Sequence, residues 1–544
     1  MQAAINSRAA CVFRCARPIL LQGRTNFDCS MLRRGASVRL IALRPFASQA
    51  QEKAAASNGP WPYSQVPGPK AIPLLGNKFR FFPGFAKYDF TNLITLHKQL
   101  RDEFGDIVKF GGLEPRRDLL FIYKPEDMET MFRNDGPWPE RPSFKALQYY
   151  RDVTNKDVFQ GLSGVLVDQG PAWQEARSQV NPVMMKTQTV QMYAGKIGDV
   201  AEDFVNMIAD MRDEKNEVPD TFKNEIHKWA LESIALVALD TRLGCLRNNL
   251  PDDSEPQRMI DSVHKMLQCL HSLEMGNTTL WTFISTPTWR EFASTLDYFT
   301  AVALKYVNEA IERSKKIPTD DGNKMSVVER FLKRDPNPTR AVIMALDMLM
   351  AGVDTTSHAL TNLLLHLSAN QEKQEKLYEE LKRLLPDPST PITNEMLDEM
   401  KYMRACIKES ARLMPVITGN ARTTQKEVVL SNYVIPKNVD VIMPNALISR
   451  MEKYYKEPDQ FIPERWIRGS DQKESVNPFV TLPFGHGARK CVGMRFASLE
   501  LEMVLAKMIR RFKWNYNYGE MKYQTFLVHV PMDPLKFQVT QRTN

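Results

Sequence analysis

The sequence predicts a mainly α-helical protein with a small β portion. Between about residues 190 and 384, apolar side chains recur with helical periodicity over long segments. The chain has 544 residues, 43% of them hydrophobic, and no internal repeat or long low-complexity linker divides it. It can therefore bury a large core in one folded domain. Strand-like runs are few and short, at 106–110, 119–123, 428–430 and 439–443.

The positive charge is concentrated in the first fifty residues. This segment holds eight arginines, no lysine and one acid, Asp28, a balance of +7 against +8 for the whole chain. Such an Arg-rich, acid-poor leader is typical of a mitochondrial transit peptide, with a disordered basic tail as the alternative. We expect a transit peptide over 1–48, a linker over 49–60 and the folded domain over 61–544. Because the rest of the chain is nearly neutral, bulk nucleic-acid binding is not expected.

The lack of a long apolar run and the spacing of the cysteines narrow the class of protein further. No run of 18 apolar residues occurs, so a membrane-spanning helix is not expected. The cysteines of the folded domain show no CxxC spacing, which disfavours a zinc or disulfide framework and indicates a reducing compartment. These cysteines are Cys245, Cys269, Cys406 and Cys491. Clustered prolines from Pro60 to Pro73 predict a stiff, non-helical entry to the domain.

A long helix is expected from Thr339 to Asn370, with unusual residues at its middle. Gly352 costs about 1 kcal/mol relative to Ala in a helix, and Asp354 and Thr355 are mediocre helix formers. Small side chains here leave room for a diatomic ligand. The Thr355 hydroxyl can bond the helix backbone and open the helix locally, and Asp354 can supply protons. A polar helix face is the alternative interpretation.

Three pairs of polar residues lie at helical spacing. Glu409 and Arg412 share one helix, which ends before Pro415, and could be a solvated pair worth about 0.2–0.5 kcal/mol. Trp173 and Arg177 lie one turn apart and could simply pack together. Like charges recur four residues apart at Arg404 and Lys408, which suits a solvated face or a docking surface for an acidic partner.

The most informative segment is the glycine-punctuated loop 484–493, which leads into an apolar helix over 494–512. It places Cys491 at a helix N-terminus, where the helix dipole is expected to lower the thiol pKa, and Arg489 adds a cation near the sulfur. Gly485, Gly487 and Gly493 allow tight turns and close approach to a flat ligand. The thiolate could be a nucleophile, a redox thiol or a metal ligand; a buried structural cysteine is the alternative.

The pattern Phe-Gly-x-Gly-x-Arg-x-Cys-x-Gly resembles the haem-binding loop of the cytochrome P450 family. The resemblance implies the P450 fold, in which a long central helix lies over the haem and the cysteine loop leads into a buried helix. It further implies haem b as cofactor, with Cys491 as the iron ligand and with Phe484, Arg489 and Gly493 at the cofactor.

The other motifs match the same family. By resemblance, Asp354 and Thr355 are the catalytic acid–alcohol pair that delivers protons during oxygen activation. Glu409 and Arg412, completed by Arg465 of the segment Pro463–Trp466, are implied to form a buried structural network beneath the haem loop. The haem propionates are implied to be held by Trp173, Arg177 and Arg422, together with Arg489.

Together with the leader, the resemblance indicates the mitochondrial clan, similar to its insect members. It implies a monooxygenase acting on a hydrophobic small molecule (a steroid, a lipid or a xenobiotic). Neither a GxGxxG unit nor a Walker loop is present, so electrons are expected from a mitochondrial, adrenodoxin-like ferredoxin with its NADPH-dependent reductase. Arg404 and Lys408 are implied to bind this ferredoxin. A haem-thiolate isomerase or peroxygenase and a non-catalytic haem sensor are the alternatives.

The resemblance also implies peripheral association with the matrix side of the inner mitochondrial membrane. Segment 275–290, rich in Trp and other apolar residues, is expected either to enter the lipid interface or to pack on the core as an ordinary loop. Expected substrate-lining segments are 141–166, 344–355 and 416–420.

Overall fold

The computed structural model describes most of the expected folded domain. The described residues are 59–72, 76–77, 80, 87–113, 116–142, 144–247, 250–275, 280–314 and 325–542. The expected transit peptide over 1–48 and all but the last two residues of the expected linker lie outside the described residues.

Helices make up most of the described structure, as the sequence predicts. They are α2 (Leu93–Phe104), α3 (Pro125–Arg133), α4 (Lys145–Tyr149), α5 (Lys156–Phe159), α6 (Gly170–Met184), α7 (Thr187–Gln191), α8 (Ala194–Met211), α9 (Phe222–Ala238), α10 (Glu255–Met275), α11 (Pro287–Ser314), α12 (Val327–Arg334), α13 (Pro338–Ala369), α14 (Gln371–Leu384), α15 (Asn394–Glu399), α16 (Lys401–Leu413), α17 (Asn445–Ile448) and α18 (Met494–Arg511). In the described part of the chain, no helix is both long enough and apolar enough to cross a membrane.

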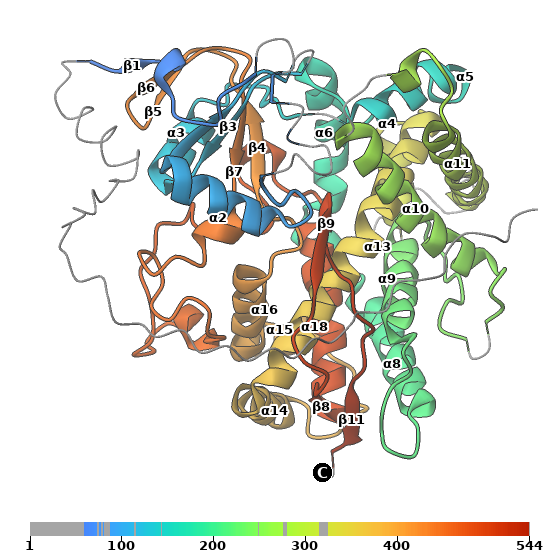
Figure 1. Cartoon of the computed structure of the whole chain (residues 1–544). Coiled ribbons are helices and arrows are strands. Elements are labelled where there is room, and N and C mark those ends of the chain that lie inside the picture. The colour runs from blue at the N-terminus through green and yellow to red at the C-terminus, as the bar shows by residue number, and fades with distance from the viewer. Residues whose placement is uncertain are drawn as a thin grey trace, which may run out of the picture. The chain divides into compact units, whose positions relative to one another are not determined.

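The central helix is α13, whose bounds agree with the prediction of 339–370 to within one residue at each end. Pro338 occupies its first turn, where a missing N–H costs nothing, and the Asn337 side chain caps it by accepting a hydrogen bond from the Thr339 N–H. The helix packs most extensively on α9 and also contacts α10, α11, α16 and α18 (Figure 1). Because helices surround it, most of its side chains are buried.

The strands form small sheets beside the helices. The largest has the order β2-β3-β7-β4 and a second has the order β1-β6-β5; two-stranded sheets pair β10 with β9 and β11 with β8. The strands are β1 (Trp61–Pro62), β2 (Ile107–Phe110), β3 (Leu119–Ile122), β4 (Asn420–Thr423), β5 (Val428–Leu430), β6 (Tyr433–Ile435), β7 (Asp440–Met443), β8 (Phe512–Asn515), β9 (Tyr523–Phe526), β10 (Val528–Pro531) and β11 (Gln538–Gln541). Figure 1 shows the largest sheet next to α2 and α3, beside the helical part.

Two apolar cores hold these parts together. One joins most of the helices, including α13 and α18, with the two-stranded sheet of β8 and β11, and the other lies under the two larger sheets, α2 and α3. All four strands expected from the sequence are present, whereas β1, β4, β6 and the four C-terminal strands were not predicted. β4 reads Asn-Ala-Arg-Thr and has no apolar alternation, so its pairing with β7 depends on tertiary contacts.

Candidate active site

The loop 484–493 folds back on itself immediately before α18. Gly485 and Gly487 have φ values of 74° and 71°, a conformation that favours glycine, and the Cys491 N–H donates to the Phe484 carbonyl at 2.9 Å. Gly493 differs from the expectation of a tight-turn glycine, because its φ is −82° at the N-cap of α18. A Cβ at that position would lie 4.0 Å from the Cys491 sulfur, so glycine keeps the surroundings of the sulfur open.

The Cys491 thiol is the accessible cysteine of the described residues. Cys245, Cys269 and Cys406 are buried, and all four are unpaired, as the sequence predicts. Although the residue is exposed to solvent on one side, the protein that surrounds its sulfur raises the thiol pKa of Cys491, and the N–H groups of Gly493 and Met494 and two arginines offset this only in part. The helix terminus therefore lowers this pKa as expected, but burial outweighs it and the net shift is upward. A metal cation bound directly to the sulfur deprotonates a thiol outright.

Four guanidinium groups converge beside this loop. Burial, followed by repulsion from Arg141, Arg422 and Arg177, lowers the pKa of Arg489 to about 9. Burial and the repulsion of Arg422 and Arg177 likewise lower the pKa of Arg141 to about 10, while the charges of Asp347 and Cys491 act in the opposite direction. Arg141 is thus close enough to feel the charges of both α13 and the cysteine loop. The cluster carries more positive charge than its carboxylate neighbours balance, so it favours an anionic ligand.

Two of these arginines have buried N–H groups without a protein partner. Among the described residues, no hydrogen bond is made by Nε of Arg177 or Nη1 of Arg489. The rest of each group is fixed: Arg177 donates to the Lys490 carbonyl at 2.7 Å, and Arg489 donates to the Pro139 and Asp168 carbonyls at 2.8 and 2.9 Å. Buried unpaired donors are costly. Acceptors that belong to a ligand would satisfy them.

The remaining predicted residues around the cluster are placed differently from the expectation. The guanidinium of Arg489 stacks 4.0 Å above the ring of the buried Trp173, so Arg177 and Arg141, rather than Arg489, are the cations that act on the sulfur. Arg422 is largely occupied, because its Nε donates to Asp135 at 2.8 Å and its Nη2 donates to the His486 carbonyl at 2.9 Å. It ties β4 to the cysteine loop.

The middle of α13 presents a strip of small side chains in an otherwise buried helix. Ala351 is exposed, and Gly352, Thr355 and Ala359 are half-buried. The Thr355 hydroxyl donates to the Ala351 carbonyl at 2.6 Å, which is the expected diversion to the backbone. The expected local opening is absent, since α13 is α-helical from Pro338 to Ala369. A Cβ at Gly352 would come within 2.6 Å of Ile234, so this glycine serves packing against α9.

Asp354 lies beside Thr355 in the sequence, but its side chain is buried among helices. Its Oδ1 lies 3.2 Å from Nε2 of His264 on α10 and 3.5 Å from Nε2 of His227 on α9. Burial raises the pKa of the Asp354 carboxyl, but His264, His227 and Lys223 outweigh it and hold the pKa below its ordinary value. The acid is therefore ionised at neutral pH. Neither histidine was predicted to be part of the site.

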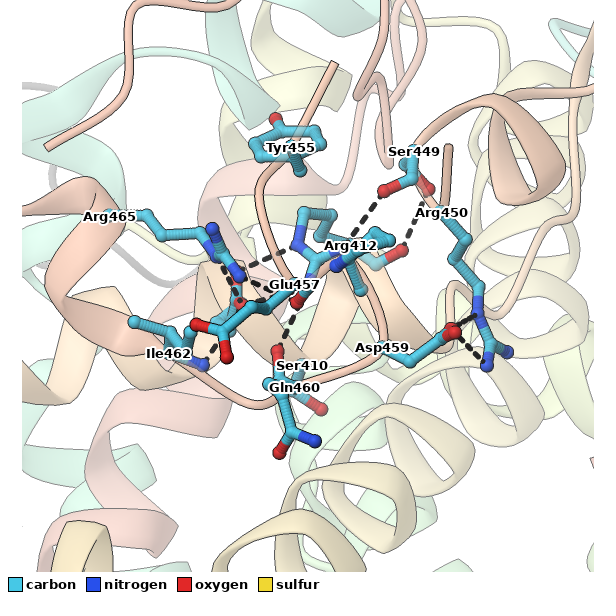
Figure 2. Close-up of polar contacts among 12 residues, drawn as sticks. Ser410, Arg412, Ser449, Arg450, Tyr455, Glu457, Asp459, Gln460, Ile462 and Arg465 are labelled. Carbon is cyan, nitrogen blue, oxygen red and sulfur yellow. Dashed lines mark hydrogen bonds and ion pairs between the residues drawn. The ribbon is translucent and has the colours of Figure 1, made fainter. Parts of the chain in front are cut away.

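The three residues of the predicted structural network meet in a buried cluster, of which Figure 2 labels Arg412 and Arg465. Glu409 accepts from Nη2 and Nε of Arg412 at 2.8 and 2.9 Å and from Nε of Arg465 at 3.2 Å. It also accepts from the Ile462 N–H at 3.0 Å and the Trp466 indole at 2.9 Å.

The same cluster fixes the chain segment that precedes the cysteine loop. Arg412 donates to the carbonyls of Ser449 and Pro458 at 2.8 and 2.7 Å, and Arg465 donates to the Glu457 carbonyl at 2.8 Å. Tyr455, whose ring lies under Arg412, hydrogen-bonds Thr481 at 3.0 Å. The charges thus hold segment 449–466, which in turn contacts Thr481, three residues before the loop.

The two basic residues of α16 differ in their surroundings. Arg404 is held by Glu502 at 3.0 Å and Asp398 at 3.3 Å. Lys408 is exposed, and no ion pair to it occurs among the described residues. Lys408 is therefore the cation of this pair that is available to an acidic partner.

The comparison with known proteins agrees with this geometry. The cytochrome P450 family profile matches residues 66–540. The chain belongs to the cytochrome P450 family. It is 39% identical to the probable cytochrome P450 301a1, mitochondrial, of Drosophila melanogaster, over 92% of each chain. Identity is also 39% with cytochrome P450 CYP12A2 of Musca domestica, over 91% of this chain and 94% of that protein. A third relative is the probable cytochrome P450 12a5, mitochondrial, of Drosophila melanogaster, at 38% identity over 89% of this chain and 92% of that protein.

The chain is thus a P450 monooxygenase, and this family binds haem. The described residues fit that group: an accessible thiol, an open place at Gly493, and buried N–H donors on Arg177 and Arg489 that suit carboxylates.

Sequence reasoning missed Arg141 as a member of the cation cluster. Its neighbours in the sequence, Glu140 and Pro142, give no sign of this, because Arg141 reaches the cluster only through the fold.

Proposed function

We propose that this P450 is a mitochondrial enzyme that inserts one oxygen atom of O₂ into a hydrophobic small molecule, with electrons supplied by a ferredoxin. The observation that carries the proposal is the accessible thiol of Cys491 at the start of α18, beside four arginines, two of which have buried N–H groups without a protein partner among the described residues. The small, partly exposed residues Ala351 and Thr355 of α13 support it, because they offer little bulk against O₂ and substrate.

We propose haem b as the cofactor. Cys491 would ligate the iron, and Arg177, Arg489 and Arg141 would bind the propionates as charge-assisted hydrogen-bond donors. Trp173 positions Arg489 by stacking, and Arg422 holds the loop at His486. The Phe484 carbonyl accepts from the Cys491 N–H, and Gly493 lies beside the sulfur. When bound, the haem supplies the oxygen-activating chemistry, which thiolate ligation favours.

The protein's own part in the reaction is proton transfer at α13. Thr355 Oγ1 can hold and pass a proton, since its bond to the Ala351 carbonyl keeps it on the accessible strip. Asp354 is ionised and one residue away, so it can take a proton from the side of His264 and return it toward Thr355. Rotation of the Asp354 side chain connects the two groups.

We propose Lys408 as the main ferredoxin contact, with Arg404 as a secondary one because two carboxylates already hold Arg404. Names of relatives that include the word mitochondrial support a mitochondrial location, here proposed as the matrix side of the inner membrane. Leu280, Phe283 and Ile284 support peripheral membrane contact, since their exposed fractions are 49%, 85% and 59%. Trp281 and Trp289 pack in the core instead, stacked at 5.0 Å.

The test is reconstitution with a mitochondrial ferredoxin, its reductase and NADPH against a panel of steroids, lipids and xenobiotics. The proposal predicts NADPH consumption and a hydroxylated or epoxidised product that depend on substrate and on ferredoxin. Turnover with peroxide alone, or isomerisation without NADPH, would favour the peroxygenase or isomerase alternative. Haem binding without turnover of any compound would favour a sensor.

A further inference from the structure

Three potential metal ligands meet outside the expected haem site, on the buried side of α13. His227 of α9, His264 of α10 and Asp354 of α13 each offer one ligand atom, and these atoms all lie within 4.8 Å of one another. The imidazoles of His227 and His264 stand edge to face, with ring centroids 4.5 Å apart. Three different helices thus converge on one point.

The hydrogen bond of His227 leaves a lone pair directed at this point. Its Nδ1 lies 2.7 Å from the Lys223 carbonyl, which can only accept, so Nδ1 carries the proton and Nε2 carries the lone pair. That Nε2 faces the Asp354 Oδ1, another acceptor, at 3.5 Å. Among the described residues, neither atom has a hydrogen-bond partner, although both are buried. His264 Nε2 lies 3.2 Å from the same Oδ1 and can donate to it, but the His227 lone pair still faces the carboxylate, and a cation between them would relieve this repulsion.

A proton is a poor candidate for that cation. Burial lowers the pKa of His227 to about 3, so the imidazole stays neutral at physiological pH. The Asp354 carboxyl is ionised, as described above. Neutral imidazole and carboxylate are the protonation states that bind a metal ion.

The two separations measured from Asp354 fit zinc. Tetrahedral zinc with bonds of about 2.0–2.1 Å separates neighbouring ligand atoms by about 3.3 Å. The observed separations from Asp354 Oδ1 are 3.2 Å to His264 and 3.5 Å to His227. Two imidazoles and one carboxylate are a common zinc ligand set, whereas Ca²⁺ and Mg²⁺ prefer oxygen ligands.

The surroundings complete the requirements of a metal site. The Lys223 carbonyl orients His227 through Nδ1, the kind of outer contact that metal-bound histidines usually make. The side chain of His264 is 34% exposed, which gives an ion a path from solvent. The fourth position would be taken by water or by the second carboxylate oxygen.

We propose that His227, His264 and Asp354 form a zinc site, and that zinc bound there withdraws the Asp354 carboxylate from proton transfer. Zinc bound there would hold the Asp354 carboxylate against α9 and α10 and prevent its rotation toward Thr355. Zinc would then slow turnover reversibly; this consequence rests on the proposed role of Asp354, whereas the binding site itself does not.

The binding test is equilibrium dialysis of the haem-loaded protein against zinc sulfate, with zinc and iron counted by mass spectrometry. Wild type should bind one zinc per haem. His264→Ala should bind zinc at this site at least tenfold more weakly than wild type. His271→Ala is the matched control, because His271 lies two turns along the same helix and outside the cluster; it should bind as wild type does. Equal zinc binding by wild type and His264→Ala would overturn the site.

The functional consequence is tested separately. Zinc should inhibit turnover by wild type and by His271→Ala, and a chelator should restore that turnover. Turnover by His264→Ala should be insensitive to zinc. Zinc that binds at His264 without slowing turnover would leave the site standing and refute the proton-transfer role of Asp354. Asp354→Asn should also abolish zinc binding, and retention of binding would overturn the ligand assignment.

Discussion

Removal of the Glu409 charge should destabilise the fold strongly. This fully buried carboxylate accepts five hydrogen bonds, three of them from the guanidinium groups of Arg412 and Arg465. Glu409→Gln keeps the shape but leaves the buried Arg412 without a counter-charge among the described residues, whereas Arg465 keeps its ion pair with Glu474. Breaking a buried pair in this way costs about 3–5 kcal/mol, because the remaining charge is not resolvated. We expect a loss of this size in the free energy of unfolding.

A matched control separates the effect of burying a charged pair from the effect of pairing alone. Glu129 and Arg133 of α3 also form a charged pair within one helix, but their side chains are 33% and 76% exposed. Exposed pairs are worth about 0–1 kcal/mol, since water replaces the lost interaction. Glu129→Gln should therefore change the free energy of unfolding by no more than this amount.

The assay is urea unfolding of the haem-loaded protein, followed by circular dichroism, where lower stability appears as a lower midpoint at unchanged slope. If Glu409→Gln does not fold, Arg465→Lys provides a milder break, because lysine keeps the charge and loses the forked geometry. The urea midpoint of Arg465→Lys should lie below the midpoints of wild type and Glu129→Gln and above the midpoint of Glu409→Gln. Equal midpoints for Glu409→Gln and Glu129→Gln would refute the reasoning.

Two further predictions concern charge on other helices. Burial raises the pKa of Glu500 from 4.5 to about 8, and the Thr356 hydroxyl offsets only part of this. Folding then takes up a proton between these values, so the stability of wild type relative to Glu500→Gln should fall as pH rises from about 4.5 to about 8; a pH-independent difference in urea midpoint would contradict this. At Lys408, charge reversal to Glu should slow reduction by ferredoxin several-fold at low ionic strength and leave haem content unchanged, because the attraction is electrostatic. The control is Lys98→Glu on α2, and equal stopped-flow reduction rates for both variants would reject the docking role.

Local patterns allowed part of this structure to be predicted. The bounds of α13 and α18 follow from apolar periodicity and from the proline and glycine at their starts. The positive φ of Gly485 and Gly487 follows from the need for glycine in a tight loop. Such features depend on residues close in the sequence, so a single sequence contains the signal.

The rest of the site depends on contacts between distant segments. His227, His264 and Asp354 lie far apart in the chain and show no ligand spacing, so only helix packing reveals them as a group. The predicted direction of the Cys491 thiol pKa was wrong for the same reason. The lowering by the helix terminus is a local effect, whereas the burial that outweighs it is a tertiary effect. Arg141 also joined the cation cluster only through the fold.

The central claim is that the sulfur of Cys491 ligates haem iron, and the carbon monoxide difference spectrum of the reduced protein tests it most directly. Wild type should show the long-wavelength Soret band of thiolate ligation, and Cys491→Ala should lose it. Cys406→Ala, which removes a buried thiol away from the loop, should keep the band. Retention of the band in Cys491→Ala, or its absence from wild type, would contradict the account.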